Sequence, residues 1–201
     1  MTNADKLAPH RPLTAYYADE NARHRWLRRV FDDTAGDYDR IEWLMALGSG
    51  RRYRRQALAR AGLTEGMRVL DVGTGTGLTA LEAARIAGSG ERVLGIDPSV
   101  GMLNHARLPP GMRVIEGRAE ALPVDDASCD LVSMGYALRH VSDLRAVFSE
   151  FNRVLRPAGA HACWRSRGRR ARWRRASYGF TCEESCRYWR ASSGARAICR
   201  N

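Results

Sequence analysis

A glycine-rich turn followed by an acidic residue is the part of this chain with the clearest chemical content. Residues 69–77 read Val-Leu-Asp-Val-Gly-Thr-Gly-Thr-Gly, and Asp97 closes the next apolar segment. Because Gly73, Gly75 and Gly77 lack side chains, a ligand can approach the backbone N–H groups and the positive end of the helix expected after the turn. An acidic side chain at the end of a second strand can accept both hydroxyls of a ribose. The pattern therefore predicts a site for a nucleotide-like cofactor.

The spacing of the glycines indicates which cofactor. A dinucleotide fingerprint, G-x-G-x-x-G, requires glycine at position 78, where this chain has Leu78. Asp71 also ends the first strand, and Asp-x-Gly-x-Gly-x-Gly resembles the first motif of class I S-adenosylmethionine (SAM) methyltransferases. That resemblance implies that Asp71 reaches the positively charged methionine end of SAM, directly or through water. The alternative is a glycine-rich connection with no ligand, and the later motifs favour the methyltransferase.

Composition and length restrict the class of protein. A chain of 201 residues predicts one domain with a substantial core. The sequence has no apolar run long enough for a transmembrane helix. Residues 1–18 are polar and lack the apolar stretch of a secretory signal, so we expect a disordered N-terminus and a cytoplasmic location.

The positive charge of the chain is confined to its last part. Residues 1–159 carry a net charge of +2, whereas residues 160–201 carry 11 Arg and 2 Glu. The Arg and Trp mixture of that tail could suggest nucleic-acid binding. Because the charge does not extend into the main domain, we expect no nucleic-acid partner.

Apolar patterning predicts an alternating arrangement of strands and helices after three initial helices. The initial helices are expected at residues 19–31, 41–47 and 51–61. Strands at 67–72, 92–96, 112–116 and 129–134 then alternate with helices at 77–87, 99–107 and 143–155. This order predicts an α/β protein with a doubly wound, mainly parallel, Rossmann-like sheet and an incomplete C-terminal part. Ligands of such sheets bind at the carboxyl ends of the strands.

Four further segments identify a family when they are taken together with the glycine turn. They are an N-terminal signature (Val30-Phe31-Asp32, Tyr38-Asp39 and residues 48–55), then 117–123 (Gly-Arg-Ala-Glu-Ala-Leu-Pro), 137–143 (Ala-Leu-Arg-His-Val-Ser-Asp) and 152–159 (Asn-Arg-Val-Leu-Arg-Pro-Ala-Gly). In this order they resemble the ubiquinone/menaquinone biosynthesis C-methyltransferases over residues 30–159. The resemblance implies transfer of a methyl group from SAM to a ring carbon of a prenylated quinol. Such an acceptor is a small lipophilic molecule and is compatible with peripheral membrane contact.

The same resemblance implies roles for particular residues. Thr76 would line the cofactor loop, Asp97 would take the ribose hydroxyls, Arg118 and Ala119 would flank the adenine, and Gly135 would lie near the cofactor. The full set expected to bind SAM is Asp71, Gly73, Gly75, Thr76, Gly77, Asp97, Arg118, Ala119 and Gly135. Two positions depart from the family pattern. Arg118 replaces an Asp or Asn that could accept from the adenine amino group, which Arg cannot do, and His140 replaces Asn.

Catalysis of this reaction consists mainly of alignment of the carbon nucleophile with the methyl group and exclusion of water. A quinol must also be ionised, so a base or a water relay is expected. The candidates are Tyr38, Arg139 and His140. Each has a structural alternative: Tyr38 could be a packing residue on an N-terminal lid, Arg139 could pair with Asp143, and His140 could be a surface or capping residue. We expect structural roles for the other histidines, which are His10, His24, His105 and His161.

Residues 160–201 do not resemble the family. A buried strand and a helical substrate cover would be expected there, yet residues 160–175 are too charged for a buried strand. Cys182 and Cys186 are one helical turn apart, but without a second ligand pair we expect no metal site. The chain could therefore also be a methyltransferase for another small molecule, or a SAM-binding remnant without activity.

The genetic code offers an explanation for this tail. When each codon is re-read from its third base together with the next two, residues 161–169 can spell Arg-Leu-Leu-Glu-Ile-Ser-Arg-Pro. This string resembles the missing family strand. We hypothesise that the reading frame changes near Gly159.

Overall fold

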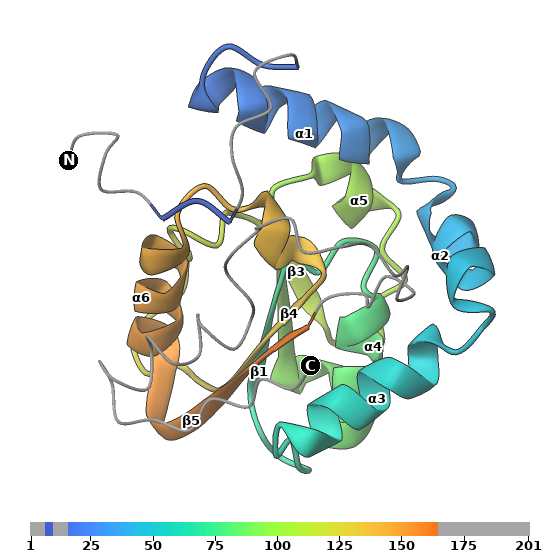
Figure 1. Ribbon diagram of the computed structural model, residues 1–201. Coiled ribbons are helices and arrows are strands. Elements are labelled where there is room, and N and C mark those ends of the chain that lie inside the picture. Colours follow the sequence, from blue (N-terminus) through green and yellow to red (C-terminus); the bar gives the residue numbers. More distant parts are fainter. Residues whose placement is uncertain (1–6, 10–15, 165–201) are drawn as a thin grey trace, which may run out of the picture.

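The computed structural model describes residues 7–9 and 16–164 of the chain, which are coloured in Figure 1. Five strands form one parallel sheet in the order β3-β2-β1-β4-β5. The strands are β1 (Val69–Val72), β2 (Val93–Asp97), β3 (Arg113–Glu116), β4 (Cys129–Gly135) and β5 (Leu155–Trp164). The α-helices are α1 (Glu20–Thr34), α2 (Tyr38–Ala46), α3 (Gly50–Arg60), α4 (Leu78–Ala87), α5 (Val100–Asn104) and α6 (Leu144–Val154). The doubly wound parallel sheet predicted from the sequence is thus confirmed.

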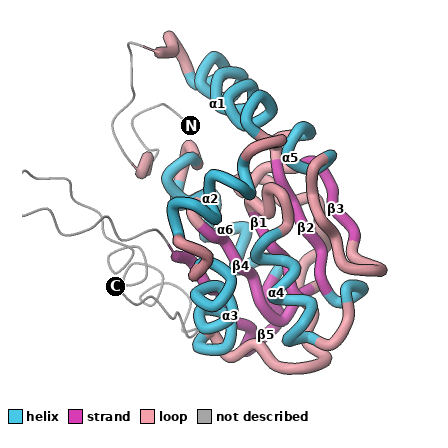
Figure 2. The backbone as a smooth tube through the Cα atoms, turned by 90° about the vertical axis from the view of Figure 1, so that its right-hand side faces the viewer, coloured by secondary structure: helices cyan, strands magenta, loops and turns pink. Residues whose placement is uncertain are grey.

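Helices cover both faces of the sheet because successive side chains of a strand point to opposite sides. In β1, Leu70 and Val72 join a core cluster with the apolar side of α6. Val69 instead joins a second cluster with residues of α3 and α4. Figures 1 and 2 show the sheet between these layers, with α6 on one side and α3 and α4 on the other.

The helix α6 illustrates how local sequence produces this packing. The Asp143 carboxylate accepts a hydrogen bond from the backbone N–H of Arg145 at 2.9 Å, which caps the start of the helix. Val147, Phe151 and Val154 recur at helical spacing and are completely buried against the sheet. A cap and an apolar stripe in phase therefore fix both the start of α6 and the face that it buries.

The edge strand β5 corrects one expectation. Residues 160–164 were expected to be too charged for a buried strand, but they pair in parallel with β4, for example Ser133 with Ala162. The expectation was wrong for this part because His161, Ala162 and Cys163 are uncharged and buried. The charged residues of the expected segment begin at Arg165, outside the described residues.

Several sequence-based expectations lie wholly or partly outside the described residues. His10 and the tail cysteines Cys182 and Cys186 belong to them, as does most of the N-terminal segment 1–18. Within that segment, Leu7 is bonded to the start of α6: its N–H donates to Asp143 and its carbonyl accepts from Leu144. Among the described residues, no helix is long and apolar enough to cross a membrane.

Candidate cofactor and acceptor site

The glycine loop between β1 and α4 adopts a conformation that leaves open space at its centre. Gly73 and Gly75 have φ angles of +68° and +55°, in the left-handed region that favours glycine. A Cβ on Gly73 would lie 2.5 Å from the Cβ of Ala137, so this position also requires glycine for close approach. A Cβ on Gly75 would meet nothing within 4 Å. The loop therefore forms a cradle against which a cofactor can lie.

Asp71 lies beneath this loop at the carboxyl end of β1. Its side chain is buried and accepts hydrogen bonds from the hydroxyls of Thr74, at 2.8 Å, and Ser133, at 2.6 Å. Burial raises the pKa of Asp71 to about 6, and the two hydrogen bonds oppose that rise. The carboxylate is thus oriented by the protein and holds a negative charge below the loop at neutral pH.

Asp97 occupies the corresponding position at the end of β2, adjacent to β1 in the sheet. Its carboxylate accepts from the backbone N–H groups of Gly75, at 2.8 Å, and Ser99, at 2.9 Å. Burial raises the pKa of this carboxyl group, whereas both backbone hydrogen bonds lower it. A carboxylate has about four acceptor positions, so capacity remains for the hydroxyls of a ribose. The carboxyl ends of β1 and β2 therefore place two acidic side chains at one loop.

The N-terminal helices are bonded directly to the cofactor loops. The Thr76 hydroxyl donates to the Asp39 carboxylate of α2. In α1, Asp32 accepts from the Ser99 hydroxyl at 2.6 Å and from the N–H of Gly101 at 2.9 Å. Asp32 and Asp39 were given no role from the sequence. Both stand in the N-terminal signature of the family resemblance, and this was the feature from which a role could have been predicted.

The remaining expected cofactor residues lie on neighbouring elements. Gly77 caps the start of α4 with a φ of +87°, and Gly135 ends β4. Ala119, in the segment after β3, is buried in the core cluster. The Arg118 side chain forms an ion pair with Glu120, with Nε 3.5 Å from a carboxylate oxygen, and lies near His24 of α1. The guanidinium of Arg118 therefore already pairs with Glu120, and its charge acts on the His24 ring of α1.

Tyr38 is the first residue of α2 and precedes Asp39, which bonds to Thr76 of the glycine loop. It is partly buried, and burial raises the pKa of its phenol. The charges of Arg54 and Arg139 lower this pKa, and those of Glu42 and Asp97 raise it. Tyr38, a candidate for the catalytic site, is therefore close enough to Asp97, a candidate for cofactor binding, for the charge of Asp97 to act on the pKa of the phenol.

Arg139 and His140 belong to a short 3₁₀ turn, η3 (Ala137–His140), after β4. Arg139 Nε donates to His140 Nε2 at 3.0 Å, and the His140 ring meets Phe31 edge-on with centroids 5.2 Å apart. The proposed alternative of an Arg139–Asp143 pair was wrong, because Asp143 caps α6 and Arg139 bonds to the adjacent histidine. The turn brings Arg139 close enough to Tyr38 for its charge to act on the phenol.

A buried ion pair near these residues was not found by sequence reasoning. Arg54 of α3 is 5% exposed, and its Nη2 lies 2.8 Å from Oε1 of Glu42 in α2. A Cβ on Gly50 would lie 2.3 Å from that Glu42 oxygen and 2.9 Å from Arg54 Nη1, so glycine leaves room for the pair. The charge of Arg54 also acts on Asp71. Arg54 stands in a run of arginines whose other members are exposed. The sequence alone therefore does not distinguish Arg54 from its neighbours.

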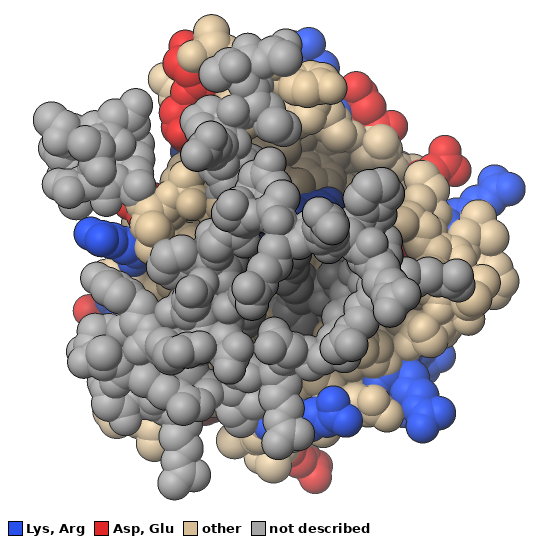
Figure 3. Space-filling model, in the orientation of Figure 1, with Lys and Arg blue, Asp and Glu red and all other residues tan. Residues whose placement is uncertain are grey.

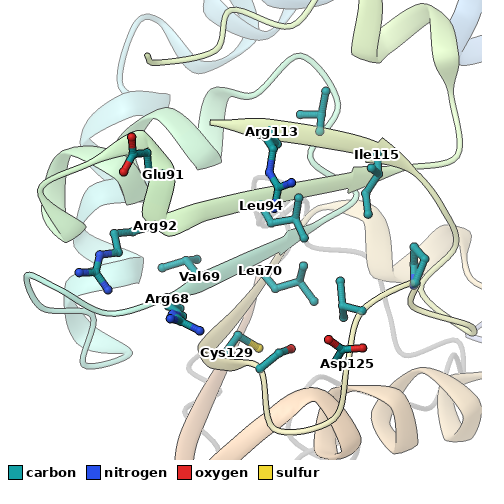
Figure 4. Close-up of a pocket in the computed structure, with 14 residues that line it drawn as sticks. Arg68, Val69, Leu70, Glu91, Arg92, Leu94, Arg113, Ile115, Asp125 and Cys129 are labelled. Carbon is teal, nitrogen blue, oxygen red and sulfur yellow. The ribbon is translucent and has the colours of Figure 1, made fainter. Parts of the chain in front are cut away.

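A hollow in the described part of the chain lies at the other end of the sheet. It has a volume of about 940 Å³ and is lined by residues at the amino ends of β1 to β4, including Leu70, Leu94 and Cys129. Figure 4 shows Arg68 and Arg113 beside these apolar side chains. Because cofactors of open α/β sheets bind at the carboxyl ends of strands, this hollow is not the cofactor site.

The fold and the site define the class of protein. Residues 70–163 match the family described as Methyltransferase domain, and this region contains the glycine loop, Asp71 and Asp97. This part of the chain, a little under half of it, is therefore similar to the class I SAM-dependent methyltransferases.

The relatives specify the resemblance further. The chain is 36% identical over 149 residues to the demethylmenaquinone methyltransferase of Symbiobacterium thermophilum, covering 70% of this chain and 59% of the relative. It is 33% identical over 150 residues to the demethylmenaquinone methyltransferase of Staphylococcus aureus, covering 73% of this chain and 62% of the relative. The chain thus resembles the quinone-methylating enzymes and spans about 60% of the length of these relatives.

Solved structures agree with the fold. A complex between the Haloferax volcanii Trm112 methyltransferase activator and a methyltransferase contains a chain 30% identical to this one, with a TM-score of 0.57 and coverage of 66% of this chain and 58% of that one. A SAM-dependent methyltransferase of Methanococcus maripaludis is 19% identical, with a TM-score of 0.58 and coverage of 66% and 62%. At that identity the second likeness shows the fold alone.

Proposed function

We propose that this protein transfers the methyl group of SAM to a ring carbon of a prenylated quinol of the demethylmenaquinol type. One observation carries the proposal: the Thr76 hydroxyl of the glycine loop donates a hydrogen bond to Asp39 of α2, so the residue next to Tyr38 contacts the loop expected to hold the cofactor. The relatives that act as demethylmenaquinone methyltransferases supply the class of acceptor.

The residues at the loop fit the parts of SAM, which supplies a methyl group activated on a sulfonium. Asp97 accepts from the ribose hydroxyls, and the loop around Gly75 and Thr76 lies along the cofactor. Asp71 places negative charge near the methionine ammonium, and Arg54 places positive charge near the methionine carboxylate. Arg118 and Ala119 flank the adenine, and Gly135, at the end of β4, lies near the cofactor. Asp71 and Arg54 are both buried and carry opposite charges. They therefore match the ammonium and the carboxylate at the methionine end of SAM.

The acceptor side must help the quinol lose a proton. Arg139 stabilises the phenolate, and Tyr38 passes the hydroxyl proton toward water. His140 is a poorer base than its type suggests, because its Nε2 already accepts from Arg139. The ring carbon then forms a bond to the methyl as the methyl–sulfur bond breaks, and the ring C–H proton leaves to solvent.

The proposal is tested by assaying methylation of a demethylmenaquinol by the 201-residue chain with SAM. We expect Tyr38→Phe to lower kcat by about a hundredfold, the contribution of a positioned proton-transfer group, with affinity for S-adenosylhomocysteine unchanged. Tyr16→Phe, at an exposed tyrosine, serves as the control. Equal turnover by Tyr38→Phe would overturn the role of this residue. Binding of S-adenosylhomocysteine without methylation of any quinol would instead support a SAM-binding remnant.

A prenylated acceptor resides in the bilayer. We therefore infer that the protein acts at the cytoplasmic surface of a membrane, which it contacts peripherally.

A further inference from the structure

The helix α2 has the reverse of the usual polarity for a surface helix. Tyr38, Asp39 and Glu42 lie on the side toward the protein, where Asp39 bonds to Thr76 and Glu42 bonds to Arg54. The rest of the helix surface and the residue just after the helix carry large exposed apolar residues, which we call the apolar ridge: Ile41 (47% exposed), Trp43 (61%), Leu44 (55%), Met45 (84%) and Leu47 (85%). An amphipathic helix normally buries such residues against its own core.

The apolar ridge is a concentrated feature. Half of the large exposed hydrophobic residues in the described part of the chain fall within residues 41–47. Single exposed apolar residues are ordinary, but contiguous ones mark a surface that contacts a protein or a membrane. The ridge therefore requires a partner.

Positive charge borders the ridge. Arg51, Arg52 and Arg55 are exposed on α3, the next helix. Arg51 and Arg55 share one buried carboxylate, Glu82, with Arg85 of α4, so three cations face one anion. Figure 3 shows basic side chains gathered over α3. An exposed apolar helix beside arginines that outnumber the carboxylate they contact is complementary to an anionic bilayer surface, where apolar groups enter the interface and cations meet headgroups.

We propose that α2 is a membrane-docking helix, with the apolar ridge inserted into the interface of an anionic bilayer and the arginines of α3 on its headgroups. The same helix carries Tyr38 and Glu42 of the site, and Glu42 bonds to Arg54 on the side toward the protein. Docking therefore places the candidate acceptor site directly under the bilayer surface, where a lipophilic acceptor can enter. Only the statement that the acceptor is lipophilic rests on the proposed function.

The experiment is co-sedimentation of the full chain with vesicles of phosphatidylcholine alone and of phosphatidylcholine mixed with phosphatidylglycerol. We expect binding to the anionic vesicles, weakened by salt. The double variant Leu44→Gln/Met45→Gln should bind about tenfold more weakly, because two apolar side chains no longer enter the interface. The matched control is Val30→Gln/Ile115→Gln, at two exposed apolar residues on other elements, which should bind as the original chain does.

Other outcomes overturn the proposal. Equal binding by both double variants would exclude the ridge as the docking surface. Light scattering that shows a dimer broken by Leu44→Gln/Met45→Gln, without vesicle binding, would assign the ridge to a second copy of the chain. Vesicle binding is measured without methylation. The docking proposal can therefore be tested even if the quinol assay shows no activity. If the protein both methylates quinols and docks through α2, Leu44→Gln/Met45→Gln should no longer methylate a prenylated quinol in vesicles. The same variant should still methylate a water-soluble quinol.

Discussion

The hydroxyl of Thr76 in the glycine loop donates a hydrogen bond to Asp39 of α2, which lies 37 residues earlier in the chain. This bond joins the cofactor loop to the helix that also carries Tyr38. A second link, from Ser99 and Gly101 to Asp32, joins the loop after β2 to α1. Cofactor binding and the position of the N-terminal helices are therefore expected to be coupled.

The first prediction concerns this coupling. Asp39→Ala and Thr76→Val should each destabilise the chain, and the double variant should lose less than the sum because both remove one hydrogen bond to a charged group. We expect an interaction energy of roughly 1 to 2 kcal/mol in a double-mutant cycle from urea unfolding. The control is Thr34→Val, where the hydroxyl bonds only within α1. Fully additive effects would contradict the coupling.

The second prediction concerns pH and Asp71. Its pKa is raised to about 6 by burial, so the carboxyl is ionised at pH 7.5 and protonated below about pH 6. Because the proposed partner is the methionine ammonium, affinity for S-adenosylhomocysteine should be highest above pH 6 and fall as pH decreases through it. The decrease should approach tenfold per pH unit. Titration calorimetry at several pH values measures this, and Asp71→Asn should bind weakly with a flatter pH profile. A wild-type affinity independent of pH between 7.5 and 5 would refute the role.

The third prediction concerns Arg54. If it faces the methionine carboxylate, Arg54→Gln should lower affinity for S-adenosylhomocysteine by about tenfold or more, the scale of a hydrogen bond between charged groups. Affinity for 5′-methylthioadenosine, which lacks the amino acid, should change little. Arg52→Gln, on the exposed side of the same helix, should leave both affinities unchanged. An equal loss for both ligands would indicate that Arg54 maintains structure instead.

The fourth prediction concerns His161 in β5. Burial lowers its pKa to about 4, and its ring packs against Phe148 and Phe151 with centroids 5.7 and 6.3 Å away. The unfolded chain, with a pKa near 6.5, therefore binds more protons between pH 6.5 and 4, and the free energy of unfolding should fall as pH decreases through this window. The loss should reach about 3 kcal/mol. Urea unfolding across this range should show the loss, and His161→Leu should remove it. His105→Gln, at an exposed histidine, is the control.

The fifth prediction concerns the tail. Resequencing the gene from codon 155 onward should reveal a frame that continues the family resemblance after Cys163, where the match to the family ends. The frame-restored protein should methylate a quinol faster than the 201-residue chain, because it regains a substrate cover that excludes water. An intact mass that shows these 201 residues in cells, together with an unchanged gene sequence, would refute the hypothesis.

The positions of the glycine loop and of the acidic strand ends were predictable because they depend on local chain chemistry. Apolar runs set the strands, and the glycines with Asp71 and Asp97 stand where those strands end. In a parallel sheet the carboxyl ends of neighbouring strands meet at one edge, so order along the chain was enough to bring Asp71 and Asp97 together. The strand at 160–164 was missed because the charge of the following residues dominated the pattern.

Contacts between distant segments could not be read from the chain. The sequence determined the fold class, the glycine cradle and the acidic strand ends, since these follow from periodicity, turn chemistry and strand direction. Only the tertiary structure decided that Thr76 bonds to Asp39, that Arg54 alone in its arginine run is buried against Glu42, and that α2 turns its apolar side outward. These depend on how a helix rotates and docks on the sheet, which is set by packing with residues far along the chain and not by the helix's own sequence.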